Sequence, residues 1–355
     1  MYTELHCHSA FSFLDGASLP EQLALTASQL GYTGVALTDH NGLYGSMAFA
    51  HEAKQLGLQA ITGAEVTLLD GAHVTLLAET PEGYANLCRL TTAAHLGRAD
   101  RRDPRLDFAS LEARHEGLIV LSGCRSGLLP SVLQHEGPTA ARAFVERCLA
   151  VFGRENFFVE LQRNYVRGDR ALTRALIDIA RDVQLSVVAT GNVHYHARAR
   201  HRLHDVLTAI RHRTTLDGSH NVRRPNSEFS LRPPEDVAAL FGDCPDAVAN
   251  TLAIAERCRA FDLTRDLGYG FPDFRGAARA PAPLALAELC RARLVERYPE
   301  GSEYRAEAER RLAEELTLIE HHRLSGFFLV YHDLFDLARE VAADVRRGKI
   351  GRAHV

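Results

Sequence analysis

Short β-like runs alternate with amphipathic helical stretches over the first 200 residues of the chain, and this alternation constrains the fold more than any other feature. The seven predicted strands cover Thr3–His8, Gly34–Thr38, Ala60–Leu68, His73–Ala78, Leu118–Ser122, Phe157–Glu160 and Val187–Thr190. The helical patterns between them cover Leu19–Leu30, Gly45–Leu56, Gly83–His95, Gly137–Phe152 and Asp169–Gln184. Such alternation predicts a mainly parallel sheet with helices outside it. The number of strands favours a closed β/α barrel over an open sheet.

The pattern changes after the barrel. Residues 265–283 are irregular and rich in Gly and Pro, which is typical of a linker. We therefore predict a domain boundary near residue 275, between a barrel with its connector at 1–275 and a second part at 276–348. Helical sequence resumes over Tyr304–His322, where apolar residues recur at helical spacing. The apolar run Phe327–Val330 that follows is typical, by itself, of a strand.

Residues capable of metal chemistry stand at the predicted strand ends, where β/α barrels carry their active sites. His6 and His8 are two apart in a strand, so both side chains are expected on one face. The other candidates follow or flank later strands: Asp15, His40, Glu65, His73, Cys124, Asn192 and His194.

Each of these residues has an ordinary structural explanation when taken singly. A lone strand-end histidine is more often a surface residue, Cys124 alone is a small apolar side chain, and Asp15 before a glycine is a turn residue. Together they predict a metal site. Imidazole, carboxylate and thiolate suit Zn²⁺, with Mn²⁺ or Fe also compatible. More than four ligands imply two or three ions, a grouping suited to phosphoester hydrolysis. We interpret the remaining histidines of the following segment as surface or helical residues: His201, His204, His212 and His220.

Composition limits the partners and the compartment. The net charge of −4 excludes a broadly basic coat, so any contact with nucleic acid must be local. Arg98–Arg105 and Arg211–Arg224 are locally basic, and we interpret them as solvated loops rather than DNA contacts. The N-terminus lacks the pattern of a signal peptide, no apolar run has the length of a membrane span, and the seven cysteines include no CxxC pair. These features predict a cytoplasmic protein.

The motifs ELHCHSAFSFLDGAS, ALTDHNGLYG, GAEV, LSGC and ATGNVHY resemble those of the PHP (polymerase and histidinol phosphatase) domain. They resemble most closely the N-terminal PHP domain of bacterial family C DNA polymerases, the alpha subunits of polymerase III. The resemblance implies a distorted seven-stranded β/α barrel with a trinuclear metal centre at its mouth. It assigns the ligands to His6, His8, Asp15, His40, Glu65, His73, Cys124 and His194. Asn192 stands where the fully active pattern has an aspartate, so one ion is expected to be lost or held loosely.

The nearly complete ligand set resembles the error-prone branch of these polymerases, which acts in DNA damage tolerance. The stretch from Glu307 to Glu340 resembles the helical start of the polymerase body, which favours a polymerase over a free-standing phosphatase. Nucleotidyl transfer needs closely spaced carboxylates that hold Mg²⁺, and no such pair occurs in a suitable strand context. The chain by itself is therefore expected to carry out only metal-dependent phosphoester hydrolysis. We expect residues 349–355 to be a non-native tail at the end of a truncated sequence.

Three hypotheses follow. In the first, the chain is the PHP portion of an error-prone polymerase that works with DNA, dNTPs and other replication or translesion proteins, away from membranes. Its metal cluster is then structural or a weak 3′–5′ phosphodiesterase. In the second, the chain is a stand-alone metallophosphatase of the histidinol-phosphatase type. In the third, it is a catalytically silent interaction module with structural metals.

Overall fold

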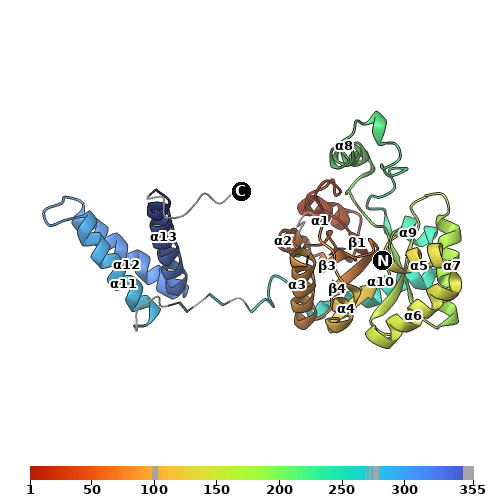
Figure 1. Ribbon diagram of the computed structural model, residues 1–355, viewed down its shortest axis with the longest axis horizontal. Coiled ribbons are helices and arrows are strands. Elements are labelled where there is room, and N and C mark those ends of the chain that lie inside the picture. The colour runs from red at the N-terminus through yellow and green to blue at the C-terminus, as the bar shows by residue number, and fades with distance from the viewer. Residues whose placement is uncertain (98–102, 269, 272, 275–279, 347–355) are drawn as a thin grey trace. The chain divides into compact units, whose positions relative to one another are not determined.

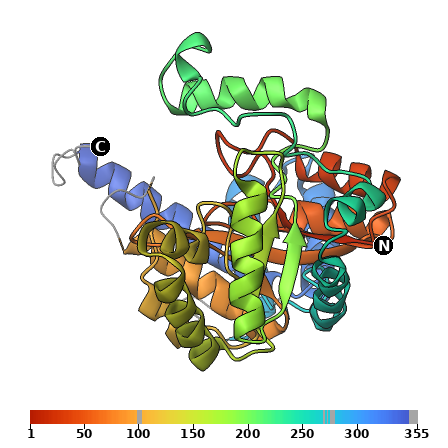
Figure 2. The same cartoon turned by 90° about the vertical axis from the view of Figure 1, so that its right-hand side faces the viewer.

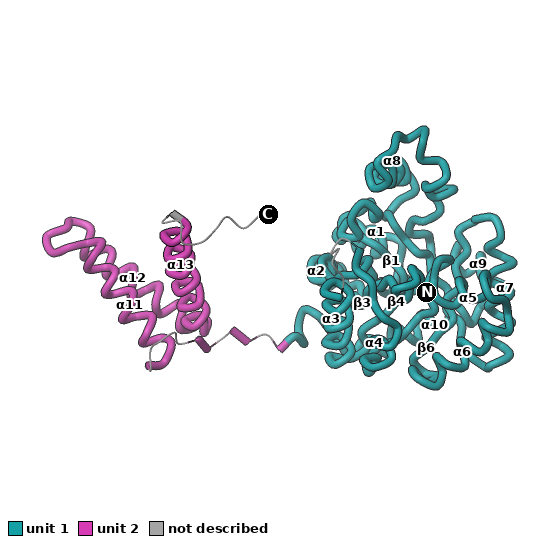
Figure 3. The backbone as a smooth tube through the Cα atoms, in the orientation of Figure 1, with its two compact units in different colours: residues 1–267 teal, residues 268–355 magenta. Residues whose placement is uncertain are grey.

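A computed structural model describes residues 1–97, 103–268, 270–271, 273–274 and 280–346. The chain divides into two compact units, Met1–Leu267 and Gly268–Val355, and each is described by itself (Figure 3). The predicted boundary near residue 275 and the predicted tail 349–355 both lie outside the described residues.

The first unit is a seven-stranded barrel with helices around it (Figures 1 and 2). All seven predicted strands form: β1 Thr3–Cys7, β2 Gly34–Leu37, β3 Gln59–Thr67, β4 His73–Ala78, β5 Leu118–Leu121, β6 Phe157–Gln162 and β7 Val187–Thr190. They pair in sequence order from β1 to β7. Val193, just after β7, donates its N–H to the His6 carbonyl at 2.9 Å and accepts from the His8 N–H at 2.7 Å. These bonds nearly close the barrel.

Helices follow most strands, as the alternation predicts. The five predicted helices form as α1 Pro20–Gln29, α2 Ser46–Gln55, α3 Pro81–Leu96, α6 Pro138–Phe152 and α7 Asp169–Asp182. The structure adds α4 Phe108–Ala113 and α5 Leu128–Glu136, and after β7 it adds α8 His201–Arg211, α9 Pro234–Leu240 and α10 Pro245–Arg257.

Strand β4 runs against its neighbours, antiparallel to both β3 and β5, while the other strand pairs are parallel. Only residues 68–72 separate β3 from β4, which is too short for a parallel crossover, so the two strands form a hairpin. The reversal has a direct consequence for function. The first residue of β4, His73, pairs with Thr67 at the end of β3 and so lies at the same rim as the ends of the parallel strands.

The barrel interior has two layers. The lower layer is apolar and receives residues from every strand, packed against Ile254 and Ala255 of α10: Leu5, Ala36, Ile61, Leu77, Ile119, Leu121, Phe158 and Val188. The upper layer is buried but polar: His6, Glu65, Thr75, Glu160 and Thr190. A register shift in β1 between Glu4 and Cys7 allows both Leu5 and His6 to face inward. Polar side chains therefore fill the half of the barrel nearest its mouth.

The described residues of the second unit form three helices, α11 Ala282–Arg297, α12 Arg305–His321 and α13 Ser325–Arg346. Its small core consists of Ala282, Ala285, Leu286 and Leu329. The interpretation of Phe327–Val330 as a strand is wrong, because this run lies within α13. A short apolar run has no period that separates a strand from a helix, and here the helix continues to Arg346. Among the described residues, no helix combines the length and apolar character needed to cross a membrane.

Candidate metal centre

A cavity of about 870 Å³ opens at the mouth of the barrel. Seven of the nine predicted site residues line it: Asp15, His40, Glu65, His73, Cys124, Asn192 and His194. The other two, His6 and His8, are completely buried beside it. Their Nε2 atoms lie 3.0 Å apart, as expected for two side chains on one strand face.

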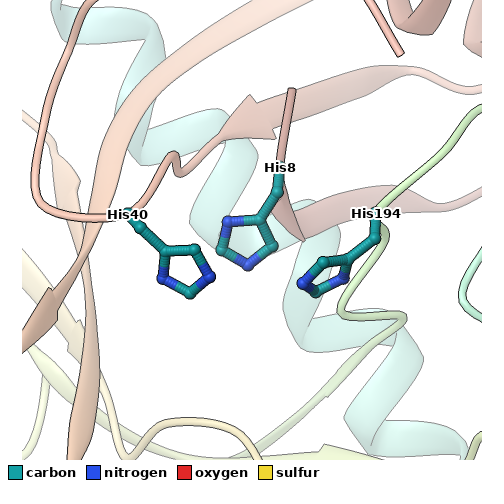
Figure 4. Close-up of side chains that lie close together, drawn as sticks. All are labelled: His8, His40 and His194. Atoms are coloured by element: carbon teal, nitrogen blue, oxygen red, sulfur yellow. The ribbon is translucent and has the colours of Figure 1, made fainter. Parts of the chain in front are cut away.

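Three overlapping groups of side chains each bring three possible ligand atoms within 4.8 Å of one another. The groups are His8–His40–His194, His6–His8–Glu65 and His40–Glu65–His73. Figure 4 shows the first group, with the His8 ring between the other two. The His8 ring centroid is 4.3 Å from that of His40 and 4.4 Å from that of His194.

Glu65 belongs to two of the three groups and lies beside His40, which is a member of the other. Its Oε2 lies 2.7 Å from His40 Nδ1, and its Oε1 lies 3.3 Å from His6 Nε2 and 3.2 Å from His73 Nδ1. Although Oε1 is buried, it has no hydrogen-bond partner among the described residues. Burying a carboxylate oxygen without a partner is costly. A cation between Glu65 and the imidazoles would satisfy it.

The electrostatics of the cluster also favour a cation. Burial works against a charged His6, but the carboxylates of Glu160 and Glu65 outweigh it and raise the pKa of His6 to about 10. Burial likewise opposes a charged His40, yet Glu65 and Asp15 raise its pKa to about 9. Positive charge is therefore stabilised at His6 and His40, while burial and the neighbouring His40 hold the pKa of His8 well below its usual value. Imidazole nitrogens around a shared carboxylate form a donor set that fits Zn²⁺ and related divalent ions.

The backbone carbonyl of Asn192 orients the His194 ring. Its Nδ1 lies 2.8 Å from the Asn192 carbonyl oxygen, which leaves Nε2 directed at the cluster. Burial and the Arg224 guanidinium hold the pKa of His194 well below its usual value. Arg224 Nη2 donates to His194 Nε2.

Glu160 is a site residue that the sequence analysis missed. Its Oε1 lies 2.6 Å from His6 Nδ1 and accepts from Thr190 Oγ1 at 2.5 Å and from Gln162 Nε2 at 2.7 Å. These contacts fix the His6 ring so that Nε2 faces His8 and Glu65. The available signal was the pair Glu160 and Gln162, two polar residues on one face at the end of an otherwise apolar strand.

We expect Glu160→Gln to lower metal affinity by about 10- to 100-fold, because partners that orient a ligand histidine have effects of this size. The amide keeps the shape of the carboxylate but loses the charge that holds the His6 Nδ1–H. Isothermal titration of Zn²⁺ into the metal-stripped chain measures the change. Equal affinity in the variant and the parent chain would show that Glu160 does not orient a ligand.

Asp15 lies at the edge of the cluster. Its carboxylate is 3.0 Å from His40 Nε2 and 3.6 Å from His194 Nε2. Burial opposes ionisation of Asp15, but His194, His204 and His40 hold its pKa well below the usual range. His204 is helical as expected, but it is not a surface residue, because its side chain is 3% exposed and its Nε2 lies 3.3 Å from Asp15 Oδ1. It is contributed by α8, which follows β7 along the chain.

Cys124 and Asn192 occupy different parts of the cavity wall. Cys124 Sγ lies 3.7 Å from His73 Nδ1, and burial raises the pKa of the thiol well above its usual value. Asn192 has a positive φ of 47°, which Asn adopts more readily than most residues. Its Nδ2 donates to Gln162 Oε1 at 3.4 Å, and its buried Oδ1 has no partner among the described residues. Asp15 and Cys124 fall outside the three ligand groups found among the described residues.

The interpretation of the basic stretches as solvated loops is wrong for Arg105 and Arg224, whose side chains are 24% and 23% exposed, whereas Arg211 is 53% exposed. Arg105, Arg211 and Arg224 line the cavity, and Arg211 Nη1 donates to Asp15 Oδ2 at 3.1 Å. Residues 98–102 of the first stretch lie outside the described residues.

Comparison with known proteins places this geometry in context. Residues 4–164 match the model of the PHP domain family. The chain is 40% identical over 356 residues to an error-prone DNA polymerase of Symbiobacterium thermophilum, a match that covers 96% of this chain and 32% of the relative. It is 36% identical over 351 residues to an error-prone DNA polymerase of Mycobacterium tuberculosis, with the same coverage. The chain thus spans about a third of the length of these relatives.

Solved structures resemble the chain more distantly. An amidohydrolase from Chromobacterium violaceum matches with a TM-score of 0.38 and 15% identity over 55% of this chain and 88% of that one. Endonuclease Q, in complex with a duplex that carries an abasic lesion, matches with a TM-score of 0.34 and 12% identity over 54% of this chain and 49% of that one.

Proposed function

Because the chain contains a PHP domain and is related to the error-prone DNA polymerases, we propose that it is the PHP portion of such a polymerase and that its metal centre hydrolyses phosphodiester bonds at the 3′ end of DNA. For the whole polymerase, we propose DNA and dNTPs as substrates, Mg²⁺ at the polymerase site, replication or translesion proteins as partners, and the cytoplasm as the location.

One observation carries the hydrolytic part of this proposal: each pair of the three ligand groups shares one residue, and Glu65 is the residue shared by the second and third groups. Overlapping groups suit two or three neighbouring divalent ions, and Zn²⁺ best matches a set rich in imidazole. Such ions supply Lewis-acid chemistry to phosphoester hydrolysis, by polarising phosphoryl oxygens and making water nucleophilic at neutral pH.

The residues of the chain have separate roles in this proposal. His6, His8, His40, His73 and His194 would hold the ions together with Glu65, while Asp15, Cys124 and Asn192 would complete the set. Glu160 orients His6. Arg211 and Arg224 bring positive charge to the cavity, where it would bind and neutralise the phosphate of the substrate.

A structural role for the metal is compatible with the same site. The upper layer of the barrel is polar, and a bound ion would neutralise the buried Glu65 carboxylate. Ligand binding to the folded state alone raises stability by mass action. Metal-dependent stability and metal-dependent hydrolysis therefore need separate measurements.

We expect the purified chain to contain at least two metal ions, measured by plasma mass spectrometry, and to melt several degrees lower after chelation. We also expect it to shorten a 5′-labelled single strand from its 3′ end and to lose this activity on chelation. Fewer than one ion per chain would contradict the metal centre. A lower melting temperature without hydrolysis would assign the metal a structural role, and faster turnover of histidinol phosphate than of DNA would favour the stand-alone phosphatase.

A further inference from the structure

Three aromatic rings stand exposed at the mouth of the cavity. Phe11, Phe13 and Tyr44 are 44%, 83% and 64% exposed, and all three line the cavity that contains His40 and Glu65. Single exposed apolar residues are common on protein surfaces. Three aromatic rings around one polar cavity are a more specific arrangement, and we call them the aromatic rim.

The loop that presents Phe11 and Phe13 is held rigidly. Buried Asp39 accepts hydrogen bonds from the Ser9 N–H at 2.7 Å, from Ser9 Oγ at 2.7 Å and from Ser12 Oγ at 2.6 Å. Gly16 packs so closely that a Cβ there would lie 1.8 Å from the Ser9 carbonyl oxygen. The Phe13 ring is therefore exposed on a fixed backbone, and binding a ligand there would order little additional chain.

A basic segment stands beside the rim. Residues 198–224, which we call the basic arm, contain seven arginines and only two acidic residues, Asp205 and Asp217, in a chain whose net charge is −4. The arm includes α8 and projects from the barrel (Figures 1 and 2). It meets the cavity through Arg211 and Arg224.

Part of the arm is available to a ligand. Arg202 and Arg213 are exposed, and neither forms an ion pair with another described residue. At the other end, the Arg224 guanidinium carbon lies 4.3 Å from the centroid of the Phe229 ring, which holds Arg224 at the cavity wall. Positive charge thus extends from the cavity along the arm.

We infer that the aromatic rim and the basic arm form a binding site for single-stranded DNA. An unpaired terminal base would stack on Phe13 or Tyr44, while the phosphates would lie along the arm. Aromatic rings interleaved with cationic side chains form the general recognition surface for single strands, since every base has a π-face and every linkage a charge. This inference rests on the proposed function and adds that the strand end must be unpaired.

The same features argue against a small phosphomonoester as the ligand. A single phosphate needs charge only at the cluster, where Arg211 and Arg224 already supply it. It would not reach the further arginines of the arm or need three exposed rings. A base-paired end would also fit poorly, because its terminal base is already stacked and paired within the duplex.

Fluorescence anisotropy tests the site without requiring hydrolysis. The probes are a labelled oligothymidylate of roughly twelve nucleotides with phosphorothioate linkages and a blunt hairpin of similar charge. We expect the single strand to bind at least tenfold more tightly than the hairpin. Phe13→Ala and Tyr44→Ala should each weaken binding of the single strand about tenfold, the usual size of a lost base–aromatic stack, and Phe13→Trp should restore it.

Charge reversal tests the arm. Arg202→Glu combined with Arg213→Glu should make the salt dependence of binding shallower by about 1.4 in logarithmic slope, which corresponds to two lost phosphate contacts. The matched controls are Arg174→Glu with Arg181→Glu on α7, which do not line the cavity, and Tyr304→Ala, which removes an equally exposed ring in the second unit. These controls should bind as the parent chain does.

The outcomes separate this inference from the proposed function. Unchanged binding by the Phe13 and Tyr44 variants, or equal affinity for the hairpin, would overturn the single-strand site even if the chain hydrolyses DNA. Loss of binding in these variants would support the site even if no hydrolysis is found. Folding of each variant is checked by its melting temperature.

Discussion

Glu65→Gln is expected to remove at least one metal ion per chain and to lower any hydrolytic activity by at least 100-fold. The carboxylate is the one anionic ligand shared by two of the three ligand groups, and its Oε1 has no other partner among the described residues. The amide has nearly the same shape, so the barrel should pack as before. Its neutral oxygen, however, cannot balance the charge of ions held by His6, His8, His40 and His73. Plasma mass spectrometry after dialysis measures the ions retained.

The matched control is Glu112→Gln. Glu112 is also paired with a basic group, since Arg147 Nη2 donates to it at 2.7 Å, but it lies in α4 and does not line the cavity. This control should keep its full metal content and activity. If Glu65→Gln retained the metal of the parent chain, the ions would have to bind elsewhere.

Asn192→Asp is expected to raise the affinity of the site for metal, in contrast to Glu65→Gln. The backbone at Asn192 has a positive φ that aspartate also tolerates, and the buried Oδ1 lacks a partner among the described residues. A carboxylate there would add a charged ligand beside His194. We expect the affinity for the most weakly held ion to rise by at least about 10- to 100-fold. Residues that only orient a ligand already have effects of this size on metal affinity. Hydrolysis of a 5′-labelled strand from its 3′ end should rise with occupancy.

Asn192→Gly separates the side chain from the backbone in this experiment. Glycine accepts the same positive φ but offers no ligand atom, so it should bind metal no better than the parent chain. A rise in affinity with both Asp and Gly would attribute the effect to backbone relaxation. No change with Asp would exclude position 192 from the metal shell.

Much of this architecture could be predicted because its signals are local. Each strand is marked by a short apolar run, and the ligand candidates at the ends of those runs gather because a barrel brings its strand ends to one rim. His6 and His8 are the simplest case, since their spacing alone determines that they share a face. The other seven candidates line one cavity because the strand ends of a barrel meet at one rim.

The missed features depend on contacts that are distant in sequence. Glu160 reaches His6 across 154 residues, and His204 reaches Asp15 across 189, so no local pattern marks either contact. Arg224 is similar: a basic stretch is usually solvated, and only the return of the arm to the barrel places this guanidinium beside His194. The strand interpretation of Phe327–Val330 is wrong for another reason. The run is too short for its period to distinguish a helix from a strand.

The reversed strand β4 also has a consequence for the order in which the site forms. The β3–β4 hairpin closes through the five residues 68–72, and it carries both Glu65 and His73, eight positions apart. Contacts this local form early, whereas those from His6 to Glu160 require closure of most of the barrel. A nascent chain would therefore present two of the three ligands of the His40–Glu65–His73 group on one hairpin before the remaining strands arrive. The ions could then guide the order of assembly as well as stabilise its product.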